Sequence, residues 1–349
     1  PNEASGKDWI GNAARHGRLA VVFARLLVGE EDHGVHAVLV PIRSEKGRSL
    51  DGIRIEDRGL KLGLNGVDNG RIWFDAVRVP VENLLDRFAS IDEEGRYHSP
   101  IPSSGRRFFT MLSTLVAGRV SIASAAVSAA KRGLTIAIRY TADRRQFGPS
   151  GAPEVPVLSY TTMQRALMPR VAATYALHFA MRELQDRFDR WARSGEEDPE
   201  LEVLAAGLKA WASDHCTDTL VVAREACGGQ GYLADNHFAA LKADTDIFTT
   251  FEGANVVLYQ LAAKGLLSRY RDEMGSLDVR AALRYLGERA ETSLTELNPV
   301  VTRRTDDDHL LDAAFHRSAL EYREERLLRS VAMRMRARLR EGMDSFAAV

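Results

Sequence analysis

A carboxylate in a setting suited to proton abstraction lies in the run Thr249-Thr250-Phe251-Glu252-Gly253-Ala254-Asn255. Glu252 stands between an aromatic ring and a glycine, just before an apolar segment with helical spacing. A carboxylate acts as a general base where its surroundings are dry and a substrate reaches it. The same pattern is typical of a helix start, with Thr249 or Thr250 as the cap and Glu252 in the first turn, where the helix dipole favours negative charge. On its own, the segment favours the helix start, because caps are common and catalytic bases are rare.

A second cluster, Arg144-Arg145-Gln146-Phe147-Gly148-Pro149, follows a long helical pattern. Paired guanidinium groups with an amide and an aromatic ring suit a diphosphate next to a flat heterocycle. A basic last turn followed by glycine and proline also marks the end of a helix. These residues alone leave both interpretations open.

A third cluster, Cys227-Gly228-Gly229-Gln230-Gly231-Tyr232, has three glycines in four residues. Such a backbone can approach a ligand closely, and its exposed N–H groups can hold an anion. Glycines used for turns in a loop between helices explain the same pattern. Here too both interpretations stay open.

Several common site motifs are absent from the sequence. Neither G-x-G-x-x-G after a strand nor G-x-x-x-x-G-K-[ST] occurs, and there is no G-x-S-x-G. His215-Cys216 has no matching second pair, and His33 with His36 falls in a predicted strand and its approach. Neither fits the spacing of known metal ligands, so we expect no metal site.

The composition narrows the possible partners and the compartment. Among 349 residues, Lys+Arg 47 against Asp+Glu 48 leaves a net charge of -1, which gives no case for nucleic acid or an anionic membrane. No apolar stretch approaches the roughly 20 residues of a membrane span. The two cysteines, Cys216 and Cys227, cannot form a disulfide framework and fit a reducing compartment. The Arg-rich run 317–340 lacks interleaved aromatics, which favours a solvated or partner-covered face over a nucleic-acid site.

The first hundred residues read as short strands. Apolar, β-branched runs cover 19–27, 35–41 and 70–80, and Asp68-Asn69-Gly70 supplies the turn before the last of them. No long helical pattern separates the runs. We therefore predict an antiparallel sheet or small barrel rather than βαβ units.

Beyond residue 105 the pattern becomes helical. Apolar residues at three- and four-residue steps predict long helices at 107–145, 159–194 and 200–227, and a fourth from Glu252 to about Tyr270. Helices of this length suit a bundle. Residues from 277 onward predict further helices, so the fold class is α+β.

The clusters, taken in chain order, resemble one protein family. The residues that carry the resemblance are Gly34-Val35-His36-Ala37-Val38-Leu39-Val40-Pro41-Ile42-Arg43, Asp68-Asn69-Gly70, Ile136-Ala137-Ile138-Arg139-Tyr140 leading into Arg144-Arg145-Gln146-Phe147-Gly148, Cys227-Gly228-Gly229-Gln230-Gly231-Tyr232, and Thr250-Phe251-Glu252-Gly253. Their order and spacing are similar to those of the acyl-CoA oxidases, the flavin-dependent branch of the acyl-CoA dehydrogenase superfamily. The likeness covers almost the whole chain and is clearest from about residue 7 to 270.

The resemblance implies three parts in an acyl-CoA dehydrogenase-like fold. Residues 1–95 are similar to the middle β-barrel domain, incomplete because its first strands are missing. Residues 105–270 are similar to the helical bundle that binds the flavin and carries the base. Residues 275–349 resemble the start of a second C-terminal helical domain, truncated here. The N-terminal helical domain of the family is absent from the sequence.

The activity implied by the resemblance is α,β-dehydrogenation of a fatty acyl-CoA to a trans-2-enoyl-CoA, the first step of fatty acid β-oxidation. Glu252 would remove the α-proton while the β-hydrogen passes as hydride to FAD. The backbone N–H of Glu252 would donate to the thioester carbonyl, which stabilises enolate-like charge. Phe251 would exclude water and Gly253 would make room for the substrate. Electrons would pass to O₂ and give H₂O₂.

The resemblance also implies positions for the cofactor and the substrate. The positions matching the FAD site are Arg145, Gln146, Phe147, Gly228, Gly229 and Gly11. The first three match a segment that reaches the FAD of a neighbouring subunit, so a homodimer is the expected unit. Arg119 matches an arginine associated with the CoA part of the substrate; its alternative is a helix-face arginine paired with a nearby acid.

Two other functions remain open from the sequence. The first is a dehydrogenase that passes electrons to an electron-transferring flavoprotein, and the second is a non-catalytic fragment or assembly subunit with an incomplete flavin site. The C-terminal extension and the Cys227-Gly228-Gly229 form favour the oxidase. The expected compartment is the cytoplasm if the protein is bacterial and the peroxisome if it is eukaryotic.

Overall fold

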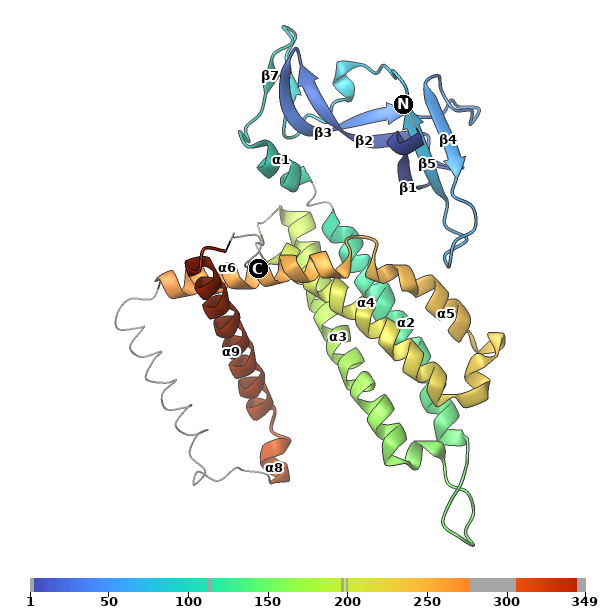
Figure 1. Ribbon diagram of the computed structural model, residues 1–349. Coiled ribbons are helices and arrows are strands. Elements are labelled where there is room, and N and C mark those ends of the chain that lie inside the picture. Colours follow the sequence, from blue (N-terminus) through green and yellow to red (C-terminus); the bar gives the residue numbers. More distant parts are fainter. Residues whose placement is uncertain (1–2, 112–114, 196–197, 199, 277–305, 344–349) are drawn as a thin grey trace. The chain divides into compact units, whose positions relative to one another are not determined.

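The computed structural model describes residues 3–111, 115–195, 198, 200–276 and 306–343. The chain forms two compact units, Pro1–Leu258 and Tyr259–Val349. Figure 1 shows the order of the elements along the chain, from strands to long helices. The predicted α+β class is confirmed. The predicted domain boundaries remain predictions.

The described strands form three small antiparallel sheets. One sheet has the order β1 (Lys7–Gly11), β5 (Asn69–Phe74), β4 (Ile53–Asp57); the others pair β2 (Leu19–Val28) with β3 (Glu31–Pro41), and β6 (Ser90–Ile91) with β7 (Tyr97–His98). The predicted strands at 19–27 and 35–41 are confirmed as β2 and β3. The predicted strand 70–80 ends at Phe74, because Ala76 adopts a left-handed conformation with φ 50 that interrupts an extended chain.

Buried aliphatic side chains from several strands share one small core. Its fully buried members are Ala13, Val40, Ile42, Ile53 and Ile72. In the part of the chain that the structure describes, the sheets stay open and do not close into a barrel. The barrel implied by the resemblance is thus present only as open sheets around this core.

The predicted turn before β5 is held by a carboxylate. Asp68 accepts hydrogen bonds from three successive backbone N–H groups, those of Ala14, Arg15 and His16, at 2.9–3.1 Å. At Gly70 a Cβ would lie 2.7 Å from the backbone nitrogen of Ala14, so only glycine permits this close approach. These contacts fasten the loop after β1 to the start of β5.

Long helices follow the strands, joined by short 3₁₀ turns. The helices of the first unit are α1 (Ser104–Met111), α2 (Leu115–Asp143), α3 (Thr161–Ser194), α4 (Leu201–Ala226), α5 (Phe238–Asp246) and the start of α6 (Asn255–Ser276). The predicted helices 159–194 and 200–227 are confirmed. The single helix predicted at 107–145 is instead two helices on either side of residues 112–114, which lie outside the described residues.

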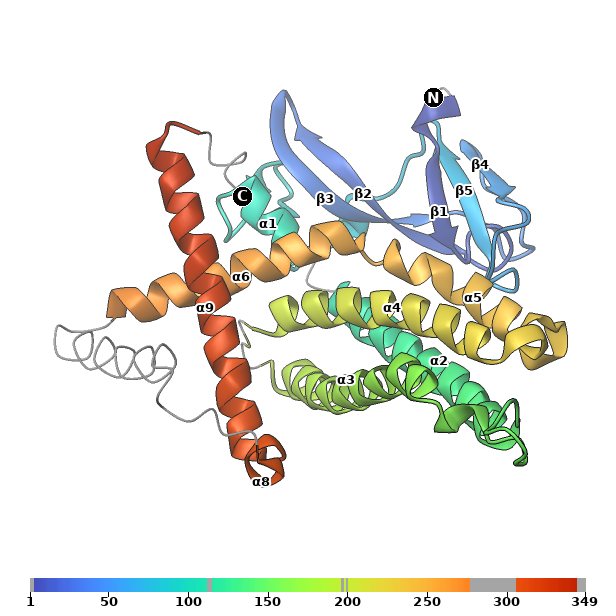
Figure 2. The same ribbon diagram turned by 60° about the horizontal axis from the view of Figure 1, so that its bottom comes forward.

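Small residues allow α2 and α4 to pack closely. Ala123, Ala126 and Ala130 of α2 are fully buried, and a Cβ at Gly133 would lie 2.6 Å from Cδ2 of Leu220. An ion pair near the start of both helices and this contact further along them show that α2 and α4 run parallel. Figures 1 and 2 show α3 running alongside in the opposite direction. The core of the bundle lies among these three helices.

The second unit is also helical in its described part. It contains α6 beyond Leu258, the short α8 (Asp307–Leu310) and α9 (Ala313–Arg340). An ion pair of 2.9 Å joins Arg269 of α6 to Glu324 of α9. The Arg-rich run 317–340 lies on α9 with mostly exposed side chains. The helices predicted at 277–305 lie outside the described residues.

No helix among the described residues is both long and apolar enough to cross a membrane.

A buried guanidinium fastens α1 to the strands. Arg107 is 3% exposed, and it donates to the backbone carbonyls of His33 and Ile101 and to Oγ of Ser99. The ring of Tyr97 stacks on His33 with centroids 3.8 Å apart, and its hydroxyl lies 3.0 Å from Nε2 of His36. A buried charge is less costly when its donors are bonded, as Nη1 and Nη2 are here to neutral oxygens, while Nε has no partner among the described residues.

Replacing Arg107 by Ala removes three charge-assisted hydrogen bonds, to Oγ of Ser99 and to the carbonyls of Ile101 and His33. We expect Arg107→Ala to lower the free energy of unfolding by about 3 kcal/mol. Urea titration of the wild type and the variant measures the difference. The neighbouring Arg106 has an exposed side chain, and Arg106→Ala should stay within about 0.5 kcal/mol of the wild type. Equal losses in the two variants would contradict the role of Arg107.

Candidate active site

The segment containing Glu252 is a turn rather than the start of a helix. The 3₁₀ turn Ile247–Thr249 ends at Thr250, and α6 begins only at Asn255. The hydroxyl of Thr249 donates backward to the carbonyl of Asp246 at 3.0 Å, so it does not cap α6. Glu252 has φ 56, a left-handed conformation that a right-handed helix cannot contain. The predicted placement of Glu252 in the first helical turn is therefore wrong.

The carboxylate of Glu252 points against α2. The residue as a whole is half-buried, whereas its Oε2 atom is buried and has no hydrogen-bond partner among the described residues. A Cβ at Gly118 of α2 would lie 2.4 Å from this oxygen. Glycine at 118 thus provides the space that the carboxylate occupies. A buried carboxylate oxygen without a partner is costly to the fold and marks a site that a ligand completes.

A buried lysine lies beneath the turn. Lys209 of α4 is 0% exposed, and its Nζ donates to the carbonyl of Gly253 at 2.8 Å and to Oδ1 of Asn255 at 3.0 Å. Burial lowers the pKa of Lys209 from 10.5 to about 8, although the charges of Asp214 and Glu252 act to raise it. The turn therefore rests on a cation in the core of the bundle.

Arg119 reaches the same turn from α2. It is buried, its Nη1 lies 3.5 Å from Oε1 of Glu202, and its Nε donates to the backbone carbonyl of Glu252 at 3.5 Å. The contact with Glu202 is the acid pairing that the alternative interpretation of this arginine expects. The contact with Glu252 also brings it to the candidate site. Its role in binding CoA remains a prediction.

Aromatic rings cover one side of the turn. Phe251 stacks on Phe248 with centroids 5.5 Å apart and planes inclined by 9°. Phe248 is buried and belongs to the core of the bundle, against which Phe251 packs. The pair covers this side of the turn with apolar surface, and the role of Phe251 in excluding water remains a prediction.

The residues matching the flavin-binding segment lie on a projecting loop. The N–H of Gln146 donates to the carbonyl of Val155 at 3.0 Å, and Nη1 of Arg145 donates to the carbonyl of Glu154 at 3.1 Å. Phe147 has φ 59 and is 71% exposed. An aromatic ring held outward on an ordered backbone is available to pack against another molecule.

The glycine cluster forms a second open surface. Gly228 and Gly229 lie in the 3₁₀ turn Gly228–Tyr232, and a Cβ at either position would meet nothing within 4 Å. Gly228 has φ 53, which glycine adopts without strain. Tyr232 beside them is 86% exposed. The backbone here is accessible, as the predicted role in anion binding requires.

These two groups and Glu252 occupy opposite ends of the bundle. The loop with Arg145 follows α2 and the Gly228 turn follows α4, and these parallel helices end on the same side in Figures 1 and 2. The carboxylate of Glu252 instead contacts α2 at Gly118. From there to Asp143 the helix rises about 37 Å at about 1.5 Å per residue. Within one chain, the predicted flavin residues and the predicted base are not brought together.

Gly11 lies apart from both groups, at the end of β1. It pairs with Asn69 of β5, and a Cβ at this position would meet nothing within 4 Å. The nearby Trp9 is exposed and has φ 59. The surroundings of Gly11 are open, and its place next to a flavin ring remains a prediction.

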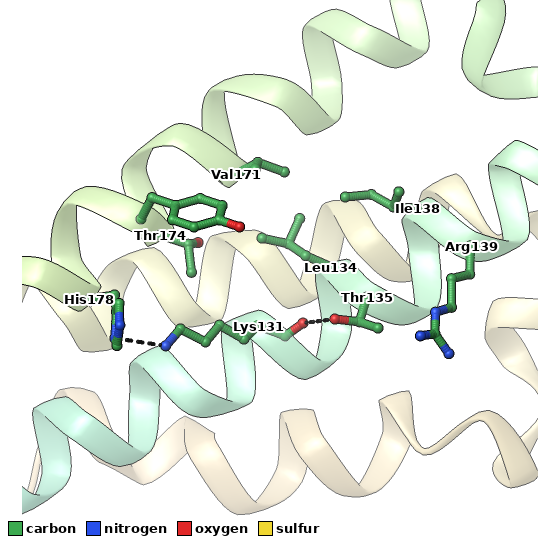
Figure 3. A pocket seen from close by; sticks show the side chains of 9 residues that line it. Lys131, Leu134, Thr135, Ile138, Arg139, Val171, Thr174 and His178 are labelled. Carbon is green, nitrogen blue, oxygen red and sulfur yellow. Dashed lines mark hydrogen bonds between the residues drawn. The ribbon is translucent and has the colours of Figure 1, made fainter.

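A groove between α2 and α3 has a volume of about 510 Å³ (Figure 3). Nζ of Lys131 lies 2.9 Å from Nδ1 of His178 across it, and the hydroxyl of Thr135 donates to the carbonyl of Lys131. The lining residues are Lys131, Leu134, Thr135, Ile138, Arg139, Val171, Thr174, Tyr175 and His178. None of the predicted site residues is among them, so this groove is separate from the candidate site.

Two residues of the site were missed in the sequence. Lys209 shares a helical face with Ala205, Ala212 and Cys216, which are all buried. A lysine at helical spacing within an apolar stripe is unusual, and the sequence alone shows it. In the sequence, Gly118 is one of several small residues along α2, a pattern that indicates only close helix packing. Its contact with Glu252 joins residues far apart in the chain and has no local sequence signal.

Comparison with known proteins identifies relatives along the chain. Residues 112–267 match the family model "Acyl-CoA oxidase, C-alpha1 domain". The chain is 45% identical over 344 residues to "Acyl-coenzyme A oxidase 2, peroxisomal" of Arabidopsis thaliana, covering 96% of this chain and 50% of that protein. The chain spans about half the length of the relatives it matches.

Solved structures give the same result. Acyl-CoA oxidase 1 from Yarrowia lipolytica matches with a TM-score of 0.83 and 30% identity, over 100% of this chain and 52% of that one. Acyl-CoA oxidase 1 of Caenorhabditis elegans, complexed with FAD and ATP, matches with a TM-score of 0.76 and 28% identity, over 100% of this chain and 50% of that one.

The lowered pKa of Lys209 predicts a pH dependence of stability. Below about pH 8 the lysine is charged in both states, and burial of the ammonium carries its full cost. Between about 8 and 10.5 the folded state loses its proton first, so this cost falls and the free energy of unfolding rises with pH. We expect the wild type to gain stability relative to Lys209→Met across this window, measured by urea titration. The exposed Lys46→Met controls for the substitution, and parallel curves for all three proteins would contradict the prediction.

Proposed function

Because this chain belongs to the acyl-CoA oxidase family, we propose that it supplies the catalytic base and part of the flavin site of an enzyme that oxidises fatty acyl-CoA to trans-2-enoyl-CoA. The observation that carries the proposal is the buried, unpartnered Oε2 of Glu252. A carboxylate kept without a protein partner, in space made by Gly118, is arranged to accept a proton from a bound molecule.

The residues that would hold FAD fit such a ligand. The backbone of Gly228 and Gly229 is open to a diphosphate, and Phe147 offers an exposed ring on an ordered loop. Arg145 lies on the same loop and has an exposed, charged side chain. These donors suit the anionic and aromatic parts of a flavin dinucleotide. When bound, FAD supplies the hydride acceptor for the β-hydrogen of the substrate.

The turn would also polarise the thioester. No described residue accepts a hydrogen bond from the backbone N–H of Glu252, so this donor is available to the substrate carbonyl. A hydrogen bond there stabilises the charge that develops on the oxygen as Glu252 removes the α-proton. Phe251 and Phe248 exclude water from one side, which strengthens both interactions. At Gly253, with φ 106, a Cβ would lie 2.9 Å from Cδ2 of Leu258, so glycine lets the turn pack closely against this side chain.

The functional unit is a homodimer in which two copies share each flavin. The segment with Arg145, Gln146 and Phe147 lies about 37 Å along α2 from the base of its own chain. One flavin cannot contact both this segment and Glu252 of the same chain. In the dimer, the exposed loop of the second copy lies close to Glu252 of the first copy. This arrangement accounts for an aromatic side chain, Phe147, left exposed on an ordered loop.

The reduced flavin passes its electrons to O₂, which becomes H₂O₂. On the substrate side, Arg119 contacts the CoA part of the acyl-CoA. Peroxisomal relatives in a plant and in humans support a peroxisomal location if the protein is eukaryotic. In a bacterium the same enzyme would act in the cytoplasm.

Anaerobic reduction tests the proposed function. The purified protein should be yellow with absorbance near ~450 nm, where oxidised flavins absorb. Adding a fatty acyl-CoA without oxygen should bleach this band, and admitting air should restore it with one H₂O₂ per flavin. Bleaching without prompt peroxide would indicate a dehydrogenase that needs an electron-transferring flavoprotein. A colourless protein would indicate a non-catalytic subunit.

Glu252→Gln tests the base within the same experiment. The amide cannot accept the α-proton, so the rate of bleaching should fall by at least about 10⁴-fold while the yellow colour remains. Glu225→Gln, at the exposed end of α4, serves as the matched control and should react like the wild type. Retained bleaching in Glu252→Gln would refute the role of Glu252.

Gly118→Ala tests the space beside the carboxylate. Its Cβ would lie 2.4 Å from Oε2 of Glu252 and must displace it, while alanine favours the helix by about 1 kcal/mol. We expect the bleaching rate to fall on the order of 10²-fold without loss of thermal stability. Gly105→Ala, in open surroundings on α1, should leave the rate unchanged. Equal rates in both variants would contradict the assigned contact.

A further inference from the structure

Lys209 occupies a position where a lysine is unexpected. It is fully buried on the face of α4 that carries Ala205, Ala212 and Cys216 into the core. Lysine is almost never fully buried unless its charge is paired or its donors are bonded. The groups that compensate the buried charge of Lys209 therefore indicate what this side chain does in the fold or at the site.

Its partners lie in the turn that carries Glu252 and at the first residue of α6. Nζ donates to the carbonyl of Gly253, the residue directly after Glu252, and to Oδ1 of Asn255. Nδ2 of Asn255 in turn donates to the carbonyl of Ala210 at 3.1 Å and to Oδ1 of Asp214 at 2.7 Å. The turn is thus fastened to α4 through both a backbone carbonyl and a buried amide.

The turn needs such a fastening because its backbone is strained. Glu252 has φ 56 and Gly253 has φ 106, two successive positive values. The left-handed region is unfavourable for a non-glycine residue and persists only where surrounding contacts impose it. The bond from Lys209 to the Gly253 carbonyl holds the peptide plane after Gly253, and the bond from Nε of Arg119 to the Glu252 carbonyl holds the plane after Glu252. Together they restrain the backbone on the C-terminal side of Glu252, from which the carboxylate projects.

Charged groups from three elements surround Nζ. Asp214 lies on the same helix, Glu252 lies on the turn, and Arg119 of α2 lies opposite, itself paired with Glu202. The two acids favour the charged lysine, and Arg119 opposes it. With a pKa of about 8, Lys209 carries a positive charge at neutral pH.

We propose that Lys209 is the positioning residue of the base, whose ammonium holds the Glu252 turn in its left-handed conformation before substrate binds. This inference rests on the proposed function of Glu252. It assigns Lys209 no contact with substrate or flavin. Its effect passes through the Gly253 carbonyl, Asn255 and the electric field at the carboxylate.

Hydrogen exchange of the ligand-free protein tests the mechanical part, independently of activity. In Lys209→Met, amides of residues 249–258 should exchange at least about tenfold faster than in the wild type, because the turn loses its anchor. Thr219→Val removes another fully buried polar group from α4, ten residues beyond Lys209 along the helix, and should leave these amides unchanged. Equal protection of the turn in Lys209→Met and the wild type would overturn the proposal.

The pH profile of anaerobic flavin reduction tests the electrostatic part. In the wild type the rate should fall as Lys209 loses its proton near pH 8, because the neutral amine holds the turn less firmly. In Lys209→Met the rate should be lower on the order of 10²-fold at neutral pH and should lack this decrease. Lys209→Arg stays charged and should also lack the decrease, even where its bulk slows the reaction. A lower rate in Lys209→Met that still decreases near pH 8 would reduce Lys209 to a structural residue.

If Lys209→Met does not fold, measuring the pKa of Lys209 itself provides a second test that leaves this residue in place. Lysine labelled with ¹³C at Cε should show Lys209 titrating at lower pH in Glu252→Gln than in the wild type, since the anion that favours the ammonium is gone. An identical titration in the two proteins would overturn the coupling. If the wild type titrates as expected yet acyl-CoA bleaches no flavin, the proposed function fails and the link between Lys209 and Glu252 stands.

Discussion

The close parallel packing of α2 on α4 is the constraint on which the candidate site depends. Alanines and Gly133 let the two helices approach, and this brings Gly118 of one helix and Lys209 of the other against a single turn. The turn has no regular hydrogen-bonding pattern of its own to define its shape. Its conformation is imposed by the two helices, so the position of the Glu252 carboxylate is a consequence of bundle packing.

The candidate site contains buried polar side chains at positions where apolar side chains would make the fold more stable. Buried charges cost free energy unless oxygens or opposite charges surround them. Arg119 and Lys209 meet this demand with backbone carbonyls, an amide and the carboxylate of Glu202. The exception is Oε2 of Glu252, which stays unpaired. A chain that satisfies its other polar groups here and leaves this one available is organised around a ligand rather than around stability.

The two ends of the bundle carry different chemistry. The base and its supports lie where α2 and α4 begin, and the exposed loop and glycine turn lie where the same helices end. Long helices make this separation rigid, so neither end can reach the other by a local movement. In the proposed dimer, two copies of the chain would share each cofactor, so each site would be complete only when a second copy contributes the far end of its bundle.

Local patterns were enough to predict the strands β2 and β3, the helices α3 and α4, and the accessible backbone at Gly228, because each depends on neighbours within a few residues. They were not enough for the turn. Thr249, Thr250 and Glu252 match a helix cap in sequence, and only the left-handed backbone at Glu252 shows that α6 begins later. The anchor of that turn is a hydrogen bond between residues 44 positions apart, from Lys209 to Gly253. Such a contact forms only when two helices and a loop meet in space. The order of motifs along the chain therefore suggests Glu252 as the candidate base, while tertiary packing decides how its carboxylate is held.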